Sequence, residues 1–162
     1  MNDTFTYRIM DESDAPLVCD LVTKVFMRSI APLYSPEGVR EFLRYIHPDA
    51  MIERTRAGNL TLLAELEGKV IGTIHIRSSN HVSLLFVDEE EQKKGIAGEL
   101  LRRAVIICKD KTPDILSVTV NSSPNSVKIY RRLGFQDTGL EEVKNGIRFT
   151  PMALDLHVGR VP

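Results

Sequence analysis

The amino-acid sequence predicts an α+β fold in which helices flank a central, twisted β-sheet. Short segments with alternating apolar residues indicate half-buried strands. Other segments begin with Ser or Asp close to a Pro and continue with apolar residues at helical spacing. The order is β-α-α-β-β-β-α-β-α-β-β, so we expect about seven strands and about four helices. Because hairpins alternate with helical connections, the sheet should be mixed and mostly antiparallel.

The first part of the chain is expected to form one strand and two helices. Residues 4–10 alternate, with Phe5, Tyr7 and Ile9 on one side, which predicts a strand. A helix begins at residues 13–16, where a proline stands near the first helical position. A second helix begins at residues 35–37 and ends near His47, because a residue before proline avoids the helical region. The segment that follows, to about residue 56, has no clear pattern.

The middle of the chain predicts a hairpin, a third strand and a long helix. Residues 60–66 and 70–76 are strands joined by Glu67-Gly68-Lys69, which is typical of a hairpin turn. A second turn at residues 78–80 leads into a strand over residues 81–87. Residues 95 to about 109 repeat apolar side chains at helical spacing, and Pro113 ends that region.

The last part predicts a strand, a short helix and a final hairpin. Residues 115–120 are rich in β-branched side chains, which favour a strand. Ser123-Pro124 opens a short helix, and Gly134 terminates it as a left-handed cap would. Residues 135–140 and 147–156 should then pair around Asn145-Gly146.

Composition indicates one domain over residues 1–162 that is not built for nucleic acid or membranes. The net charge of −1 gives no overall field for nucleic acid or an anionic membrane. No apolar run reaches the roughly 18 residues that span a bilayer, and the acidic N-terminus does not read as a secretory signal. Two cysteines, Cys19 and Cys108, are too few for a disulfide framework and read as small buried side chains. We therefore expect a cytoplasmic protein.

The first chemical signal is the loop between the strand 81–87 and the long helix. A chain that leaves a strand and starts a helix presents unpaired N–H groups and the positive end of the helix dipole. Such a site suits a phosphate or diphosphate. The loop residues are Gln92, Lys93, Lys94, Gly95, Ile96 and Ala97. The small residues in it let the backbone approach a ligand, and the two lysines add screened attraction. The loop lacks the Walker and Rossmann patterns, and an ordinary structural turn is the alternative.

The second signal follows the strand 115–120. Asn121 ends that strand, and Asn125 is expected in the first turn of the next helix, where its amide faces a ligand. Tyr130 follows five residues later, about 140° further round the helix. A phenol has a pKa near 10, so it is protonated at neutral pH and can donate a proton to a departing thiolate. The alternative is a core tyrosine whose hydroxyl is satisfied by the protein.

Together and in this order, the two signals resemble the GNAT superfamily of N-acetyltransferases. The resemblance runs from about Lys69 to Leu156. The matching residues are Leu85-Phe86-Val87, Gln92-x-x-Gly95-x-Ala97, Asn121, Asn125, Tyr130 and Gly134-Phe135. The resemblance implies a GNAT-like fold, acetyl-CoA as the cosubstrate, and direct transfer of an acetyl group to a primary amine without a metal. The amine belongs to a small molecule or a protein.

The resemblance also implies a role for each matching residue. The backbone of Leu85, Phe86 and Val87 would pair with the pantetheine arm, in a gap where two strands splay apart. Backbone N–H groups of residues 92–97 would hold the diphosphate. Asn121 and Asn125 would hydrogen-bond the cofactor, and the family places Tyr130 near the thioester sulfur. The acceptor would lie against residues 25–56 and 141–148. A homodimer is consistent with the family, although nothing in the sequence demands one.

Only a neutral amine attacks the thioester, so a base matters. At pH 7 a lysine-like amine of pKa ~10.4 needs about 4.6 kcal/mol to reach its neutral form, and an α-amino group only about 1 kcal/mol. His81 is the best candidate, because some lysine acetyltransferases of the family place a catalytic Glu at the matching spacing. An unperturbed imidazole, with a pKa near 6.5, is a competent base. His75 is the second choice, and a surface role for His81 is the alternative.

Three other functions stay open from the sequence. One is a non-catalytic acyl-CoA-binding regulatory module on the same fold. Another is an unrelated nucleotide-binding α/β domain that uses the Gly95 loop alone. The third is a transferase of longer acyl groups, because the sequence does not define the length of the acyl pocket.

Overall fold

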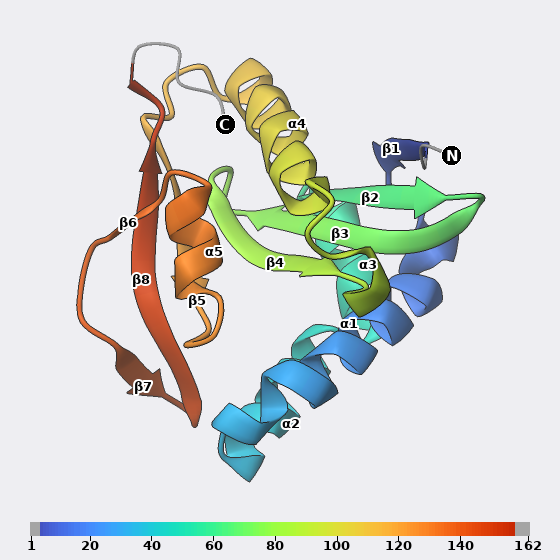
Figure 1. The fold of residues 1–162 in the computed structure, drawn as a ribbon. Coiled ribbons are helices and arrows are strands. Elements are labelled where there is room, and N and C mark those ends of the chain that lie inside the picture. The colour runs from blue at the N-terminus through green and yellow to red at the C-terminus, as the bar shows by residue number, and fades with distance from the viewer. Residues whose placement is uncertain (1–3, 158–162) are drawn as a thin grey trace.

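An eight-stranded sheet forms the centre of the computed structural model, which describes residues 4–157 (Figure 1). The strands are β1 (Phe5–Ile9), β2 (Leu60–Leu66), β3 (Lys69–Arg77), β4 (His81–Val87), β5 (Ser117–Ser122), β6 (Gln136–Asp137), β7 (Glu142–Lys144) and β8 (Ile147–Asp155). The helices are α1 (Ala15–Ser29), α2 (Pro36–Tyr45), α3 (Pro48–Arg56), α4 (Ile96–Lys111) and α5 (Val127–Arg132).

The sheet is mixed and mostly antiparallel, as predicted. Its strand order is β1-β2-β3-β4-β5-β8-β6, with β7 paired to β8. Within residues 4–157, only β4 and β5 run parallel, and every other pair of strands is antiparallel. The helix α4 connects β4 to β5, because parallel neighbours need a crossover.

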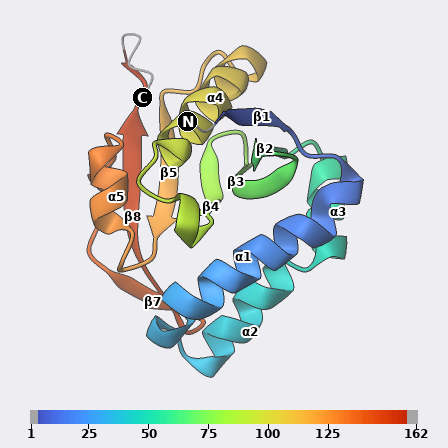
Figure 2. The ribbon, with the colours of Figure 1, turned by 45° about the vertical axis from the view of Figure 1, so that its right-hand side comes forward.

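Helices cover both faces of the sheet (Figures 1 and 2). On one face α4 packs on the sheet through buried residues such as Leu100 and Leu101, which share a core with Ile74 and Val118. On the other face α1, α2 and α3 share a second core with β2 and β4. Because side chains alternate along a strand, β2 and β4 contribute to both cores.

The segment without a clear pattern, residues 48–56, forms the helix α3. Pro48 stands in its first turn, and the Nδ1 of His47 accepts a hydrogen bond from the N–H of Asp49 at 3.2 Å. In α3 Met51 is buried against the second core, whereas much of the helix is polar. The weak apolar stripe explains why the sequence pattern did not predict this helix.

Two predictions near the C-terminal end are wrong in detail. Residues 124–126 form a turn, closed by the bond from Ser126 N–H to Ser123 O at 3.0 Å, so α5 begins only at Val127. Asn125 therefore lies before the helix and not in its first turn. The expected strand over residues 135–140 is only the short β6, and the tight hairpin is β7–β8. Its turn residues Asn145 and Gly146 have φ of 53° and 78°.

The hairpin tip meets the start of α2 backbone to backbone. The N–H of Ser35 donates to the carbonyl of Gly146 at 3.2 Å. A methyl group on Gly38 would overlap that same carbonyl, so only glycine fits there. Within residues 4–157, no helix combines the length and the apolar character needed to cross a membrane.

Candidate functional site

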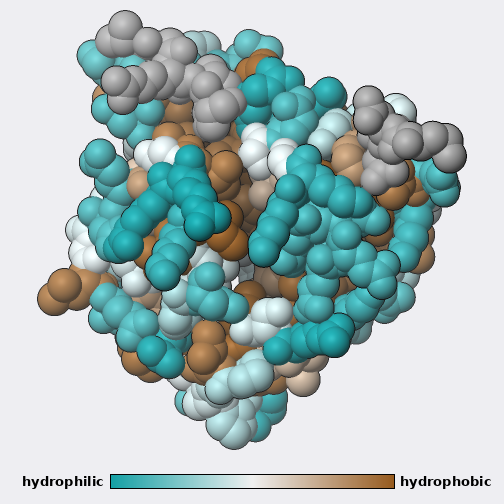
Figure 3. Space-filling model, in the orientation of Figure 1, coloured by the Kyte–Doolittle hydropathy of each residue, from teal (hydrophilic) through white to brown (hydrophobic). Residues whose placement is uncertain are grey.

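The parallel strands β4 and β5 pair at only one end. Their register contains two pairs, His81 with Thr119 and Val82 with Val120. Beyond these pairs β4 continues along β3 while β5 continues along β8, so the two strands diverge (Figure 1). The space-filling view shows a hollow with hydrophobic surface between the α5 side and the β4 side (Figure 3). The edge of β4 from Ser83 to Val87 thus offers backbone groups to an extended ligand. This is the gap predicted for residues 85–87.

A bulge in β4 lies at the point where the strands separate. Ile76 of β3 pairs with Val82, and the adjacent His75 pairs with Leu84, so Ser83 is an extra residue on β4. As a result Val82 packs in the core under α4, whereas Leu84 packs on the opposite face. The bulge increases the local twist and turns the second half of β4 away from β5.

The loop before α4 is shaped for an anion. Gly95 caps the helix in a left-handed conformation, with φ of 84°. The first helical bond runs from Glu99 N–H to Gly95 O at 3.1 Å, so the N–H groups of residues 95–98 precede it. The side-chain amide of Gln92 donates to Val87 O at 3.0 Å and ties the loop to the end of β4. Helix N-termini of this kind hold phosphates, and a diphosphate site at this loop stays a prediction.

The two asparagines are placed differently by the structure. Asn121 is exposed on β5, next to the gap. Asn125 instead contacts protein: its Nδ2 donates to the carbonyl of Ser29 at 2.9 Å, and its Oδ1 accepts from Ser123 Oγ at 2.9 Å. Asn125 thereby connects the turn before α5 to the end of α1. A cofactor ligand role for Asn125 stays a prediction, and the second hydrogen of its Nδ2 is the donor left for it.

The ring of Tyr130 packs in the core, whereas its hydroxyl is not hydrogen-bonded to the described protein. The residue is 7% exposed, and its ring contacts Phe135 edge-on at a centroid distance of 5.3 Å. Within residues 4–157 the hydroxyl makes no hydrogen bond to the protein, unlike a satisfied core tyrosine. Burial raises the pKa of Tyr130, so the phenol is protonated at neutral pH. A protonated hydroxyl is the form that a proton donor requires.

His81 lies at the closed end of the gap and is not a surface histidine. It is partly buried, and its Nδ1 lies 2.7 Å from the hydroxyl of Thr119. Burial and, secondarily, the charge of Arg77 lower the pKa of His81 from 6.5 to about 4. The expected pKa near 6.5 is therefore wrong for this position. The imidazole is neutral at pH 7, but it is a weaker base than an unperturbed histidine.

His75, the second candidate base, is more deeply buried. It is 1% exposed, and its Nδ1 lies 2.6 Å from the hydroxyl of Thr61. Its Nε2 is buried without a hydrogen-bond partner in the described chain. Burial, then Arg54 and Arg77, lower the pKa of His75 to about 4. His75 has less access to a substrate than His81.

The sequence pattern did not predict the two residues next to His81. One contacts its imidazole, and the other lowers its pKa. Thr119 and Arg77 flank His81 on neighbouring strands, one paired with it on each side. The signal for Arg77 was present, because a three-residue turn at 78–80 places residues 77 and 81 opposite each other. The contact with Thr119 depends on a parallel pairing across a whole helix, which the local sequence does not define.

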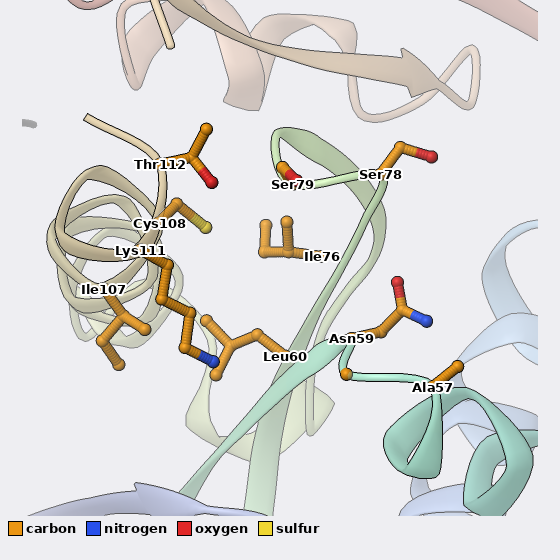
Figure 4. Close-up of a pocket in the computed structure, with 11 residues that line it drawn as sticks. Ala57, Asn59, Leu60, Ile76, Ser78, Ser79, Ile107, Cys108, Lys111 and Thr112 are labelled. Atoms are coloured by element: carbon orange, nitrogen blue, oxygen red, sulfur yellow. The ribbon is translucent and has the colours of Figure 1, made fainter. Parts of the chain in front are cut away.

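One cavity lies away from these residues. It has a volume of about 250 Å³ and lies between α4 and the ends of β2 and β3, with Cys108, Lys111, Leu60 and Ile76 among its lining (Figure 4). None of the predicted site residues lines it. Within residues 4–157, no three His, Cys, Asp or Glu side chains are grouped so as to hold a metal ion.

Comparisons with known proteins agree with the fold and the motifs. The family model described as "Acetyltransferase (GNAT) domain" matches residues 30–156. A GCN5-related N-acetyltransferase from Rhodopseudomonas palustris superposes with a TM-score of 0.80 at 20% identity, over 96% of this chain and 99% of that chain. The PaiA N-acetyltransferase from Thermoplasma acidophilum, solved with coenzyme A, has a TM-score of 0.74 at 21% identity, over 94% and 99%.

A third similar structure is YncA from Salmonella typhimurium, a putative acetyltransferase solved with acetyl-CoA. It has a TM-score of 0.70 at 20% identity and covers 98% of each chain. No sequence among the curated proteins matches this chain significantly. At these identities the structural comparisons establish the fold.

Proposed function

The chain belongs to the GNAT acetyltransferase family, and from that premise we propose that it transfers an acetyl group from acetyl-CoA to a primary amine. One observation carries the proposal: the gap between β4 and β5 runs to the open helix N-terminus at Gly95. An unpaired strand edge followed by an anion cradle matches the two parts of coenzyme A, an extended amide chain and a diphosphate.

The donor is held mainly by backbone groups. The pantetheine arm pairs with residues 85–87 along the unpaired edge of β4. The diphosphate accepts hydrogen bonds from N–H groups of the loop at residues 92–97, with Gly95 allowing close approach. Asn121 contacts the arm from β5, and Asn125 contacts it through the second hydrogen of its Nδ2.

The chemical step is a direct attack. The amine nitrogen bonds to the thioester carbon, and the carbon–sulfur bond breaks after a tetrahedral intermediate. Tyr130 gives its hydroxyl proton to the departing sulfur, and the phenolate regains a proton from solvent after turnover. His81 accepts a proton from the ammonium form of the acceptor before the attack, and the proton that the new bond leaves on the nitrogen passes to solvent. Because His81 is a weak base, an amine with a low pKa is the better acceptor.

Two measurements test the proposal. Calorimetric titration should show that acetyl-CoA binds while ATP and NAD do not. A thiol-release assay over amino acids, polyamines, aminoglycosides and N-terminal peptides should show acetyl-CoA turnover that depends on one class of amine. Binding without turnover of any amine would favour the non-catalytic acyl-CoA-binding module. The absence of binding would reject both functions.

A further inference from the structure

Arg77 lies beside the candidate base, and Arg54 lies near Arg77 and His75, on the face of the sheet that α4 does not cover. Arg77 of β3 pairs directly with His81 of β4, so their side chains are neighbours on one face. His75 lies two residues before Arg77 on β3, and its strand neighbours Ile74 and Ile76 belong to the core under α4. Arg54 reaches this face from α3, which packs on the same side. We call Arg54 and Arg77 the cationic patch.

No carboxylate in the described part of the chain forms an ion pair with either of these two guanidinium groups. In the described chain eight other arginines, from Arg8 to Arg148, form ion pairs with Asp or Glu at 2.5–3.3 Å. Within residues 4–157, neither Arg54 nor Arg77 forms such a pair. The charged groups that act on Arg54, His75 and His81 are these same arginines and Tyr45, with no acid among them.

Arg54 also has unused hydrogen-bond donors. Its guanidinium lies over the ring of Tyr45, 3.7 Å from the centroid, and its Nε and Nη2 are buried without acceptors in the described chain. Burial is the main cause of the lowered pKa of Arg54, followed by the charge of Arg77. The Nε2 of His75 and the hydroxyl of Tyr45 are buried without partners as well. Buried polar groups without partners destabilise a fold, so their grouping at one place indicates a ligand.

We propose that the cationic patch binds a carboxylate of the acceptor substrate while the acceptor's amine lies at His81. The inference rests on the proposed function and narrows it to amines that carry an anionic group. Arg77 is exposed and adjacent to His81, so it meets the carboxylate first, and Arg54 contributes from the partly buried side. Guanidinium groups suit this role because they bind carboxylates through two parallel hydrogen bonds. The same charges oppose acceptors that carry several cations, such as polyamines.

The experiment compares matched acceptors. The proteinogenic amino acids and their carboxamides differ in the negative charge and in the basicity of the amine, and kcat/KM is measured for each pair with acetyl-CoA. The ratio of kcat/KM for the acid to kcat/KM for the amide is determined for the parent and for Arg77→Gln. Dividing the first ratio by the second cancels the intrinsic reactivity of the two amines. We expect this quotient to be 10 or more, through KM for the acid. Arg77→Lys should retain part of the preference.

Lys109→Gln is the matched control. It removes one positive charge from α4, on the other side of the sheet, and should change the ratio by less than twofold. The fold of each variant is checked by thermal unfolding, and its acetyl-CoA affinity should equal that of the parent.

The outcomes separate this inference from the proposed function. If amines are acetylated but Arg77→Gln slows acid and amide equally, or if spermidine is preferred over every amino acid, the carboxylate site is wrong while the transferase function stands. If no amine is acetylated, the same acids and amides are titrated into the CoA-saturated protein. The site is supported if the acids bind more tightly than their amides and Arg77→Gln weakens the binding of the acids tenfold. Equal binding of acids and amides overturns it.

Discussion

The Nδ1 of His81 lies 2.7 Å from the hydroxyl of Thr119, at the end of the gap where β4 and β5 still pair. This bond holds the imidazole of β4 against the neighbouring strand, beside the bulge at Ser83. The candidate base is thus fixed relative to the strand edge proposed to hold the acyl donor. Its position is set by the sheet and not by a mobile loop.

The pH–rate profile follows from this environment of His81. With a folded-state pKa lowered to about 4, the imidazole stays neutral from about pH 5 upward. We therefore expect kcat/KM to show no inflection near pH 6.5 and to rise until the amine of the acceptor is deprotonated. Stopped-flow thiol release between pH 5 and 9.5 measures the profile. An inflection at pH 6.5 that His81→Ala abolishes would show that the imidazole keeps its ordinary pKa.

His81→Ala tests the base role itself. Turnover should fall at pH values below the pKa of the acceptor's amine and recover above it, because a neutral amine needs less help from a base. Thermal unfolding checks that the loss of the Thr119 contact leaves the fold intact. A profile with the shape of the parent's would remove His81 from the mechanism.

Tyr130→Phe removes the proposed proton donor and leaves the ring packing on Phe135. The transfer step should slow by roughly 10²-fold or more, the lower range for general acid catalysis, while acetyl-CoA affinity stays near that of the parent. Single-turnover kinetics and calorimetry measure the two quantities. Tyr7→Phe, on β1 outside the gap, is the control and should be silent. Turnover of Tyr130→Phe within about twofold of the parent would contradict the donor role.

Gly95→Ala should weaken acetyl-CoA binding without unfolding the protein. The position has φ of 84°, and a methyl group there points into open space. The substitution therefore costs about 1–2 kcal/mol of backbone strain and shifts the N–H groups of the loop at residues 92–97. Gly58→Ala is a matched control, with φ of 93° and equally open space but a place outside the loop. Both should lower the melting temperature alike, and only Gly95→Ala should raise Kd for acetyl-CoA. Equal acetyl-CoA affinities of the two variants would exclude the loop at residues 92–97 as the diphosphate site.

Gly38→Ala should destabilise the protein strongly, because the new methyl group collides with the carbonyl of Gly146. We expect a loss of about 2–4 kcal/mol in the free energy of unfolding, in the range of overpacked sites. Gly98→Ala is the control: it lies inside α4, meets only Leu133 at 3.4 Å, and should be neutral or stabilising by up to about 1 kcal/mol. Denaturant unfolding at neutral pH measures both. Equal stability of the two variants would contradict the close backbone approach.

Sequence patterns within a single segment predicted the secondary structure of that segment well. Residues 60–66 and 81–87 form strands with the predicted bounds, because their apolar runs are flanked by clear turn signals. The helix that opens at Gly95 also forms as expected, with a positive φ at the glycine. The family resemblance drawn from residues 85–135 is confirmed by the family model.

Features that depend on distant segments were not predictable in this way. Asn125 was placed in a helix, but the turn closed by Ser123 delays α5, and the carbonyl of Ser29 then takes its amide. The pKa of His81 depends on its burial and on a charge from the neighbouring strand, neither of which a local pattern contains. The helix α3 is held by its contact with the second core more than by its own apolar stripe.

The contact between Gly38 and Gly146 has a mechanical consequence for the gap between β4 and β5. The two strands are joined at one end by their own pairing, and the helices on one side are joined to the hairpin on the other through this glycine contact. The covalent chain and these two junctions form a closed frame, with the gap inside it. A closed frame resists rotation about a single pivot, so we expect the opening to keep a set width. A gap of constant width would favour an extended, peptide-like arm about one strand thick.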